Sequence, residues 1–481
     1  ATITLAGRSN SDIFAPLSLS IVSEKDINFT DTSETRAAYL EPNSPIIKAS
    51  GNIWTYGGSG SNKPFIQLTA SRLAISRILR ASSKALAGGI SLHGVHSVDI
   101  SPEAIITANG NDGGLIDISA QDGQVRIKGL LKANGSSGKG GTIQVDNTAI
   151  IELVGARLEA NGADGGSVLL MSNKDAVVNS SIVQTNGSNG RGGTVSISAL
   201  GQVILKNTAV QSIGFNQGGT VLIGNDIKNN TIPLAQFTYL DALSSIQAFA
   251  ISNHPGGFVE TSGQIISILA TINSGRGGTW LIDPYDLIIN SAIAANINSA
   301  LQSGQNVTLT TASETNTINS DPVTTTTGTS GTGNITLNAA ILSSGEGDLS
   351  LIADNNIYIN AAITLSGTDS GAALSGSTIY LGANITTTGK QLFPGDVVLN
   401  ASPVLDSGNA NVTITGNISA TSGILAFLGN GNYLFNGSQY LAGASADASQ
   451  PIGVIYNRSL IQISEPTRRT PITYAVFCLT Y

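Results

Sequence analysis

Pairs of adjacent glycines recur along this chain at a nearly constant interval, and this repeat restricts the fold more than any other feature. The pairs are Gly88-Gly89, Gly113-Gly114, Gly140-Gly141, Gly165-Gly166, Gly192-Gly193 and Gly218-Gly219. Their interval varies little around a mean of about 26 residues, and such a period is typical of solenoid proteins. In a solenoid each repeat buries the apolar face of its neighbour.

The repeat at residues 140–164 shows what one unit contains. It holds three apolar pairs, each with its members two positions apart, and polar or glycine-containing turns separate them. Spacing of two indicates strands, because alternate side chains point to opposite faces. The pairs are Ile143/Val145, Ile151/Leu153 and Leu158/Ala160. We therefore predict an all-β fold, a right-handed parallel β-helix with three strands and about 26 residues per coil.

Asparagine precedes glycine shortly before most of the glycine pairs, at Asn109, Asn134, Asn161 and Asn186. Asn and Gly tolerate the positive φ that a tight corner requires. If the four asparagines stack in successive coils, their side-chain amides can form a hydrogen-bonded ladder along one edge. We predict a structural role for them.

Composition narrows the classes of function. Only 11% of residues are charged, and the net charge is −8, which argues against nucleic-acid binding because that requires clustered Lys and Arg. No apolar run is long enough to cross a bilayer as a helix. Low charge with many Ser, Thr, Asn and Gly residues suits an extracellular solenoid, so we predict a secreted or cell-surface protein.

Changes in the repeat divide the chain into six predicted segments. They are an irregular, β-rich start of the solenoid (1–87), regular coils (88–230), an insertion or outward loop (231–255), a motif segment (256–290), an acidic continuation rich in Ser, Thr and Asn (291–457), and a tail (458–481). The insertion is inferred because the next glycine pair, Gly256-Gly257, follows Gly218-Gly219 by nearly one and a half repeats. Insertions in solenoids often contain the residues that bind a ligand or partner.

The tail resembles a translated sequencing adapter and is excluded from the interpretation of the fold. It contains SLIQISEPTR, the single cysteine Cys478 and the run YAVFCL. Because the chain begins at Ala1 and not at Met, we also expect its N-terminus to be missing.

Two motifs follow the insertion. Residues 256–263 read GGFVETSG, and residues 280–284 read WLIDP. Together they resemble the large exoproteins of two-partner secretion systems, of the filamentous-haemagglutinin type, and most of all the high-molecular-weight adhesins and haem–haemopexin-binding exoproteins. The matching residues are Gly256, Gly257, Phe258, Glu260, Thr261, Gly263, Trp280, Asp283 and Pro284.

The resemblance implies a bacterial exoprotein that crosses the outer membrane through a separate β-barrel transporter. It further implies contact with a host cell, glycan or matrix receptor. The family's secretion domain carries an Asn-Pro-Asn-Gly type signature, which this sequence lacks. We therefore expect the chain to start downstream of that domain or within its end.

The sequence contains few residues that could catalyse a reaction or bind a metal. His93 and His96 are three apart in a predicted strand, so they should lie on opposite faces, a poor arrangement for binding a metal. Asp283 and Asp286 flank Pro284-Tyr285, where two carboxylates could serve acid–base chemistry or Ca²⁺, but Asp before Pro is also a common turn. We predict no enzymatic activity, no cofactor and no metal site.

Three functions remain open. The first is a secreted adhesin or haemagglutinin-like protein whose β-helical stalk mediates contact. The second is an exoprotein that captures haem or a haemoprotein through an outward loop, for which 231–255 is the candidate. The third is a β-helical polysaccharide lyase or hydrolase, which would need carboxylates and a Lys or Arg on neighbouring coils of one wall.

Overall fold

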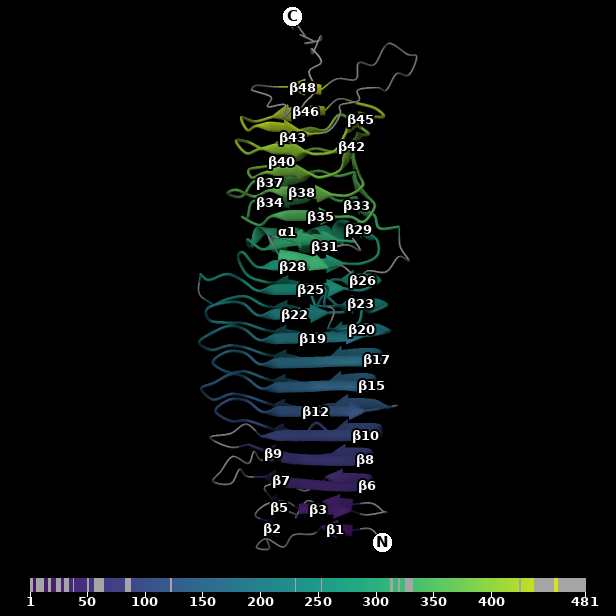
Figure 1. The fold of residues 1–481 in the computed structure, drawn as a ribbon, viewed down its shortest axis with the longest axis vertical. Helices are drawn as coiled ribbons and strands as arrows, with labels where there is room; N and C mark the ends of the chain where they lie inside the picture. The colour runs from purple at the N-terminus through teal and green to yellow at the C-terminus, as the bar shows by residue number, and fades with distance from the viewer. Residues whose placement is uncertain are drawn as a thin grey trace, which may run out of the picture.

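A computed structural model describes residues 65–82, 88–121, 123–229, 231–251, 253–311, 332–423 and 425–436, together with strand segments within 3–55, 315–324 and 454–456. In these residues the chain forms a rod of stacked coils, with the first strands at one end and the last at the other (Figure 1). The strands of successive coils pair in parallel, in turns of roughly 26 residues. The predicted parallel β-helix is therefore confirmed.

In the N-terminal part of the rod a coil contributes either two strands or one long strand to a large sheet, and a further strand to a second sheet. The large sheet contains β1 (Ile3–Leu5), β3 (Leu19–Val22), β4 (Ile27–Phe29), β6 (Tyr39–Ala49), β8 (Phe65–Ile75), β10 (Gly89–Ile100), β12 (Leu115–Ala120), β13 (Gln124–Ile127), β15 (Thr142–Val154), β17 (Ser167–Asn179), β19 (Thr194–Ala199), β20 (Gln202–Lys206), β22 (Thr220–Ile223), β23 (Phe237–Leu240), β25 (Phe258–Ser262), β26 (Ile265–Ile268), β28 (Thr279–Asp283), β30 (Asn306–Thr310), β35 (Leu349–Ile352), β38 (Ala372–Ser375), β41 (Gln391–Phe393), β44 (Val412–Ile414) and β47 (Tyr433–Phe435). The second sheet contains β2 (Ile13–Ala15), β5 (Glu34–Ala37), β7 (Asn52–Thr55), β9 (Ile78–Ala81), β11 (Ile105–Thr107), β14 (Leu130–Lys132), β16 (Arg157–Glu159), β18 (Ile182–Gln184), β21 (Ala209–Gln211), β24 (Ser245–Gln247) and β27 (Thr271–Asn273).

Toward the C-terminus the three strands of a coil belong to three sheets, the large one and two others. One contains β29 (Leu287–Ile289), β33 (Ile335–Leu337), β36 (Asn356–Ile359), β39 (Thr378–Leu381), β42 (Asp396–Leu399) and β45 (Ile418–Ala420). The other contains β34 (Ile341–Ser343), β37 (Ile363–Leu365), β40 (Ile385–Thr387), β43 (Val404–Asp406), β46 (Leu425–Leu428) and β48 (Val454–Tyr456). Three strands per coil, as predicted, are therefore found in the C-terminal coils and in some earlier ones, whereas in the repeat at 140–164 the first two predicted strands form the single strand β15.

The register shows that the coil length changes along the rod. In the regular coils Leu115 pairs with Thr142, and Thr142 with Ser167, so each coil matches the interval between glycine pairs. Farther along, Ala372 pairs with Gln391, and Gln391 with Val412, and these coils are shorter. The predicted coil length therefore holds for the regular coils but not for the acidic continuation.

Inward-facing side chains form columns that run along the rod. In one column Ile116 pairs with Ile143, Ile143 with Val168, and Val168 with Val195, and all four are fully buried. Each such side chain packs on the one in the coil below, so burial of apolar surface is shared between neighbouring coils. This packing explains why the apolar residues must keep both their spacing of two and the register between coils.

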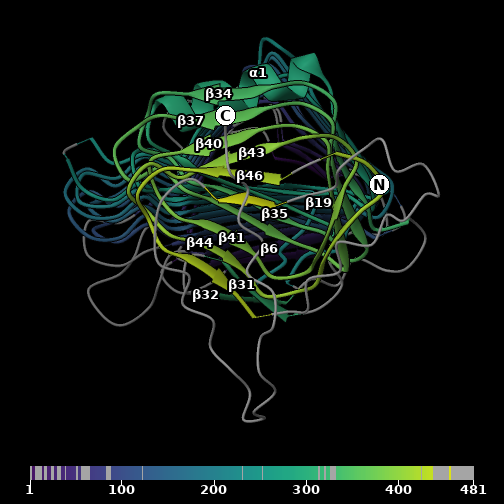
Figure 2. The ribbon, with the colours of Figure 1, turned by 90° about the horizontal axis from the view of Figure 1, so that it is seen from above.

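One coil carries a helix where its neighbours carry a strand. Helix α1 (Ser291–Gln302) contacts β27 and β34, and in the view along the rod it lies on the same side as β34 and β37 (Figure 2). The Asn290 side chain caps it by accepting hydrogen bonds from the main-chain N–H groups of Ala292 and Ile293. Its buried face packs into the core, with Ala294, Ile297, Ala300 and Leu301. The segment predicted as continuous β-helix from residue 291 thus begins with a helix.

The predicted insertion, 231–255, is placed differently by the structure. Within it, β23 pairs with β20 and β26, and β24 pairs with β21 and β27, so both are ordinary strands of the walls. The extra residues lie mainly between β22 and β23, at residues 224–236, which we call the cover segment. The Ser/Thr-rich stretch after β30 contains an antiparallel hairpin of β31 (Thr315–Ile318) and β32 (Asp321–Thr324).

The glycine pairs lie where the main chains of successive coils approach most closely. A Cβ atom added to Gly165 would lie 2.0 Å from the carbonyl oxygen of Thr185 and 2.2 Å from the main-chain nitrogen of Gly193. One added to Gly166 would lie 2.1 Å from the carbonyl oxygen of Gly141. The pairs are therefore required because no side chain fits between the coils.

The expectation that the Asn-Gly corners need positive φ is wrong, since none of these asparagines or glycines has it. Positive φ occurs instead at the corner between the large sheet and the second sheet, at Gly155, Ser180 and Asn207. The glycine of an Asn-Gly corner is needed for space: a Cβ at Gly187 would lie 1.9 Å from the carbonyl oxygen of Arg191.

We predict that Gly165→Ala destabilises the rod strongly, by about 3 kcal/mol or more, because the added methyl group collides with main chain that cannot rotate away. Gly382→Ala is the matched control, because its added Cβ would meet one atom within 4 Å, the carbonyl oxygen of Ile359 at 3.1 Å. Urea unfolding followed by circular dichroism measures both. Equal losses in the two variants would contradict the steric role of the glycine pairs.

Candidate functional site

The four predicted asparagines lie in one column along an edge of the rod. The side-chain oxygen of Asn109 accepts a hydrogen bond from the main-chain N–H of Asn134 (2.8 Å), and that of Asn134 accepts one from Asn161 (2.8 Å). Asn161 accepts from Asn186 (2.7 Å), which in turn accepts from Ile213 (2.9 Å). The ladder therefore joins side chains to main chain, whereas the sequence had indicated bonds between side-chain amides.

Glu159, on β16, is a buried charged group that lies beside this column. Its carboxylate accepts a hydrogen bond from the side-chain amide of Asn134 (3.0 Å), is paired with Arg157, and lies 3.4 Å from the ammonium of Lys132. Burial raises the pKa of Glu159, but Arg157, Asn134 and Lys132 together outweigh burial, so the pKa is lower than usual. The ionised carboxylate therefore stabilises the folded rod.

We predict that Glu159→Gln lowers the free energy of unfolding at pH 7 by about 1 kcal/mol, since the charged hydrogen bonds are lost. A depressed pKa gives stability that is present above the unfolded pKa, near 4.5, and is lost as the pH falls through the folded pKa. The difference between variant and parent should therefore shrink below pH 4.5 in urea unfolding curves.

Glu152→Gln is the control for this prediction, because Glu152 pairs with Arg126 at a more exposed position and should cost less. A Glu159→Gln deficit that stays constant down to pH 3 would contradict the assigned role of the carboxylate.

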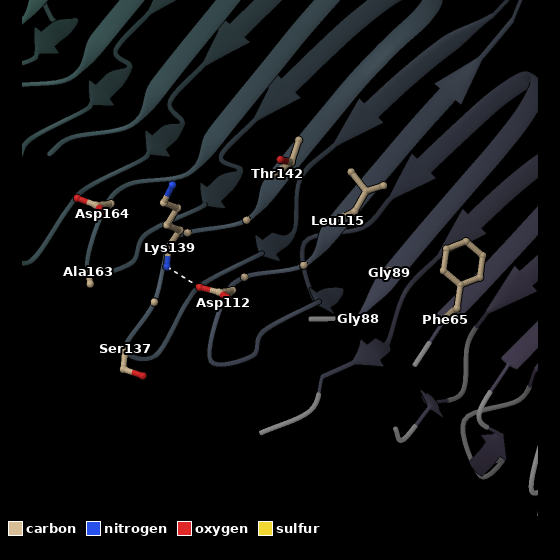
Figure 3. Close-up of a pocket in the computed structure, with 15 residues that line it drawn as sticks. Phe65, Gly88, Gly89, Asp112, Leu115, Ser137, Lys139, Thr142, Ala163 and Asp164 are labelled. Carbon is tan, nitrogen blue, oxygen red and sulfur yellow. Dashed lines mark hydrogen bonds between the residues drawn. The ribbon is translucent and has the colours of Figure 1, made fainter. Parts of the chain in front are cut away.

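A groove of about 870 Å³ follows the glycine pairs along the outer edge, and residues of five successive coils line it (Figure 3). In its lining, the carboxylate of Asp112 accepts a hydrogen bond from the main-chain N–H of Lys139 (2.9 Å). Two coils farther on, Asp164 accepts the same bond from Arg191 (3.0 Å). Both basic side chains are exposed. Along this edge an acidic corner (Asp112, Asp164) is followed in the next coil by a basic corner (Lys139, Arg191), and this arrangement recurs every second coil.

The two family-like motifs lie on adjacent coils and are joined inside the core. Strands β25 and β28 pair in register, with Val259 opposite Trp280 and Ser262 opposite Asp283. The indole N–H of Trp280, which is almost fully buried, donates a hydrogen bond to the hydroxyl of Thr261 (3.0 Å). A buried indole requires such a partner. Thr261 of one motif therefore accepts the hydrogen bond that the buried Trp280 of the other motif needs.

On the outer face of the same strands two carboxyl groups are fully buried, Glu260 and Asp283. Burial raises the pKa of Glu260 to about 8, against hydrogen bonds from the main-chain N–H of Ile227 and the hydroxyl of Ser262 (2.9 Å) that favour the ionised form. Burial also raises the pKa of Asp283 well above its usual range, and the neighbouring Glu260 raises it further. Two fully buried acids close enough for one to raise the pKa of the other often mark a functional site.

The cover segment buries these acids. Its Ile227 forms a small apolar cluster with Leu281 and Ile352 on the outer face of the large sheet, with Phe258 packed against it. The ammonium of Lys228 lies 4.4 Å from the centroid of the Phe258 ring, a cation–π contact. The carboxylate of Asp226 accepts a hydrogen bond from the main-chain N–H of Asn229 (3.1 Å) and is paired with the hydroxyl of Thr231.

The remaining motif residues have steric roles. Cβ atoms added to Gly256 or Gly257 would lie about 2 Å from main-chain oxygens of neighbouring coils, and Pro284 is buried. Gly263 is less crowded, with its nearest contact at 2.9 Å.

The carboxylate pair suggested for Asp283 and Asp286 does not form. Asp283 is buried beside Glu260, whereas Asp286 is exposed and accepts hydrogen bonds from Thr332 and Asn334.

The histidines remain near the surface. The Nδ1 atom of His93 lies 2.8 Å from the hydroxyl of Ser119, its Nε2 atom lies 3.8 Å from Asp117, and His96 is exposed. Over the described residues, no three His, Cys, Asp or Glu side chains are grouped so as to hold a metal ion.

The sequence analysis did not identify Asn225 and Asp226 as site residues. They precede the predicted insertion, and no sequence motif marks them.

Comparison with known proteins adds no identification: no protein-family profile matches the chain, and no curated protein matches it either. A search of the described residues found no helix that is both long enough and apolar enough to cross a membrane.

Proposed function

We propose that this chain is the β-helical stalk of a secreted bacterial adhesin of the filamentous-haemagglutinin type. In this proposal it crosses the outer membrane through a separate β-barrel transporter and contacts a host cell, glycan or matrix receptor with its exposed walls and edges. The observation that carries the proposal is the continuous parallel pairing of strands along the rod, which builds length and exposed surface. The paired motifs around Glu260 and Trp280 support the exoprotein family.

The edge with alternating charges is the best surface for contact within this proposal. Lys139 and Arg191 use only their main-chain N–H groups to bind Asp112 and Asp164, so their charged side chains remain exposed. They recur every second coil beside the groove, which suits an extended acidic ligand such as a sulphated or carboxylated glycan. Such a ligand would contact several coils at once.

The test measures adhesion of beads coated with the full chain to cell layers and to immobilised matrix. We expect binding above that of albumin-coated beads, and a severalfold decrease for the double variant Lys139→Glu/Arg191→Glu because the edge loses its positive charge. Lys174→Glu/Lys206→Glu is the matched control, since it makes the same change of charge at other exposed positions. Beads that adhere no better than albumin-coated beads on every surface would refute the adhesin proposal.

A second candidate is a polysaccharide lyase, favoured by one observation. Asp348, Asp369 and Lys390 come from three successive coils and line a single groove of about 590 Å³. Burial raises the pKa of Asp348, and Asp369 raises it further, while the main-chain N–H of Gly371 (2.8 Å) lowers it. This is the combination of carboxylates and a basic residue on one wall that the third function requires.

The lyase candidate predicts that the purified chain releases unsaturated sugars from acidic polysaccharides, detected by ultraviolet absorbance of the new double bond, and that Lys390→Met abolishes the release. Absence of products from a panel of uronic-acid polymers would eliminate this candidate and leave the adhesin proposal standing.

A further inference from the structure

Four buried polar atoms beneath the cover segment lack hydrogen-bond partners in the part of the chain that the structure describes. They are both carboxylate oxygens of Asp283 and both polar atoms of the Asn225 side chain, and both residues are fully buried. Buried polar atoms without partners cost free energy, and a group of them in a folded protein requires an explanation, such as a bound ion that satisfies them. Asn225 belongs to the cover segment and Asp283 to β28, so the group lies between the segment and the wall.

These atoms face one another. The Asn225 amide lies close enough to Asp283 to favour the ionised carboxylate, although no hydrogen bond of acceptable geometry joins them. Glu260 lies beside Asp283 and contributes a second carboxyl group. Ser262 lies next to both acids, because its hydroxyl donates a hydrogen bond to Glu260 and Ser262 pairs with Asp283 in the strand register.

Positive charge near this group is scarce. Lys228 is the basic residue that acts on Glu260, and its ammonium lies over the ring of Phe258. Asp226, buried just before Lys228 in the sequence, adds a further negative charge. Buried carboxylates require a countercharge, and carboxylate and amide oxygens together form the ligand set that Ca²⁺ prefers.

We propose that Asp283 and Asn225, with Glu260 beside them, bind a divalent cation of oxygen preference, Ca²⁺ in an extracellular setting. The cation satisfies the oxygen atoms of Asp283 and Asn225 and balances the buried charge. It also connects the cover segment to β28, so that its binding holds Ile227 against Leu281 and Ile352 on the outer face of the sheet. The choice of Ca²⁺ rests on the proposed extracellular location, whereas the site itself does not depend on adhesion.

The experiment uses the full chain, freed of metal with EDTA and then titrated with CaCl₂ or MgCl₂ in a calorimeter, with thermal unfolding measured in parallel. We expect one bound Ca²⁺ per chain, a rise of several degrees in Tm with Ca²⁺, and a smaller effect of Mg²⁺. Asp283→Asn and Asn225→Ala should each weaken binding at least about tenfold. Asp164→Asn, which changes a carboxylate at the glycine edge, should leave Ca²⁺ binding unchanged.

Because a variant in the cluster could fold poorly, Glu260→Gln provides a second measurement, since Gln is isosteric and can still accept from the main-chain N–H of Ile227. Its circular dichroism spectrum should match the parent while Ca²⁺ binding is reduced. A parent chain that gives neither heat nor a Tm shift with Ca²⁺, or an Asp283→Asn variant that keeps both, would overturn the proposal. In that case Asp283 carries a proton and pairs with Asn225 as a neutral acid.

Discussion

The close approach of the main chains at the glycine edge is the constraint on which the rest of the rod depends. Carbonyl oxygens such as those of Thr185 and Gly141 occupy the space where side chains at Gly165 and Gly166 would lie. Because this edge fixes how each coil lies on the next, it also fixes the register of the strands that follow. The apolar columns and the asparagine ladder can align only once that register is set. Glycine at these positions therefore matters more to the fold than any single apolar contact.

Much of the fold could be predicted because its signals are local and periodic. Alternation within a strand and a constant interval between glycine pairs are both visible in the sequence, and together they specify walls and coils. Helix α1 was missed because a single helix can replace a strand when its buried face, with Ala294, Ile297 and Leu301, fills the same part of the core. The interval between glycine pairs reveals how much longer a coil is, but not which corner contains the extra chain. The strand-like residues Phe237–Leu240 were for that reason assigned to the insertion when they belong to the wall.

The site was only partly predictable, for a different reason. The motif residues Glu260 and Asp283 could be identified by resemblance, yet their burial depends on where the cover segment folds. Asn225, at the start of that segment, has an ordinary sequence context and is far from Asp283 along the chain. Contacts of this kind come from the path of one loop across the outer face of a sheet, and no repeat encodes that path. The same limit applies to Lys228 and its contact with Phe258.

The motif strands also differ from the other coils in using both faces of the sheet. In a regular coil the inward residue is apolar and the outward residue meets water, so neighbouring positions carry independent constraints. In β25, Thr261 points inward to the indole of Trp280, and Glu260 and Ser262 point outward beneath the cover segment. Glu260, Thr261 and Ser262 thus each have a buried partner, on one face of the sheet or the other. This explains why the motif contains specific polar residues, whereas an ordinary β-helix strand requires only alternating apolar and polar residues. Since the coils become shorter beyond this point, the doubly buried strands lie where the regular stack gives way to a second geometry. Where coils of different length meet, a coil packs less regularly on its neighbour than in the regular stack. Burial of β25 and β28 on both faces compensates for the packing that is lost.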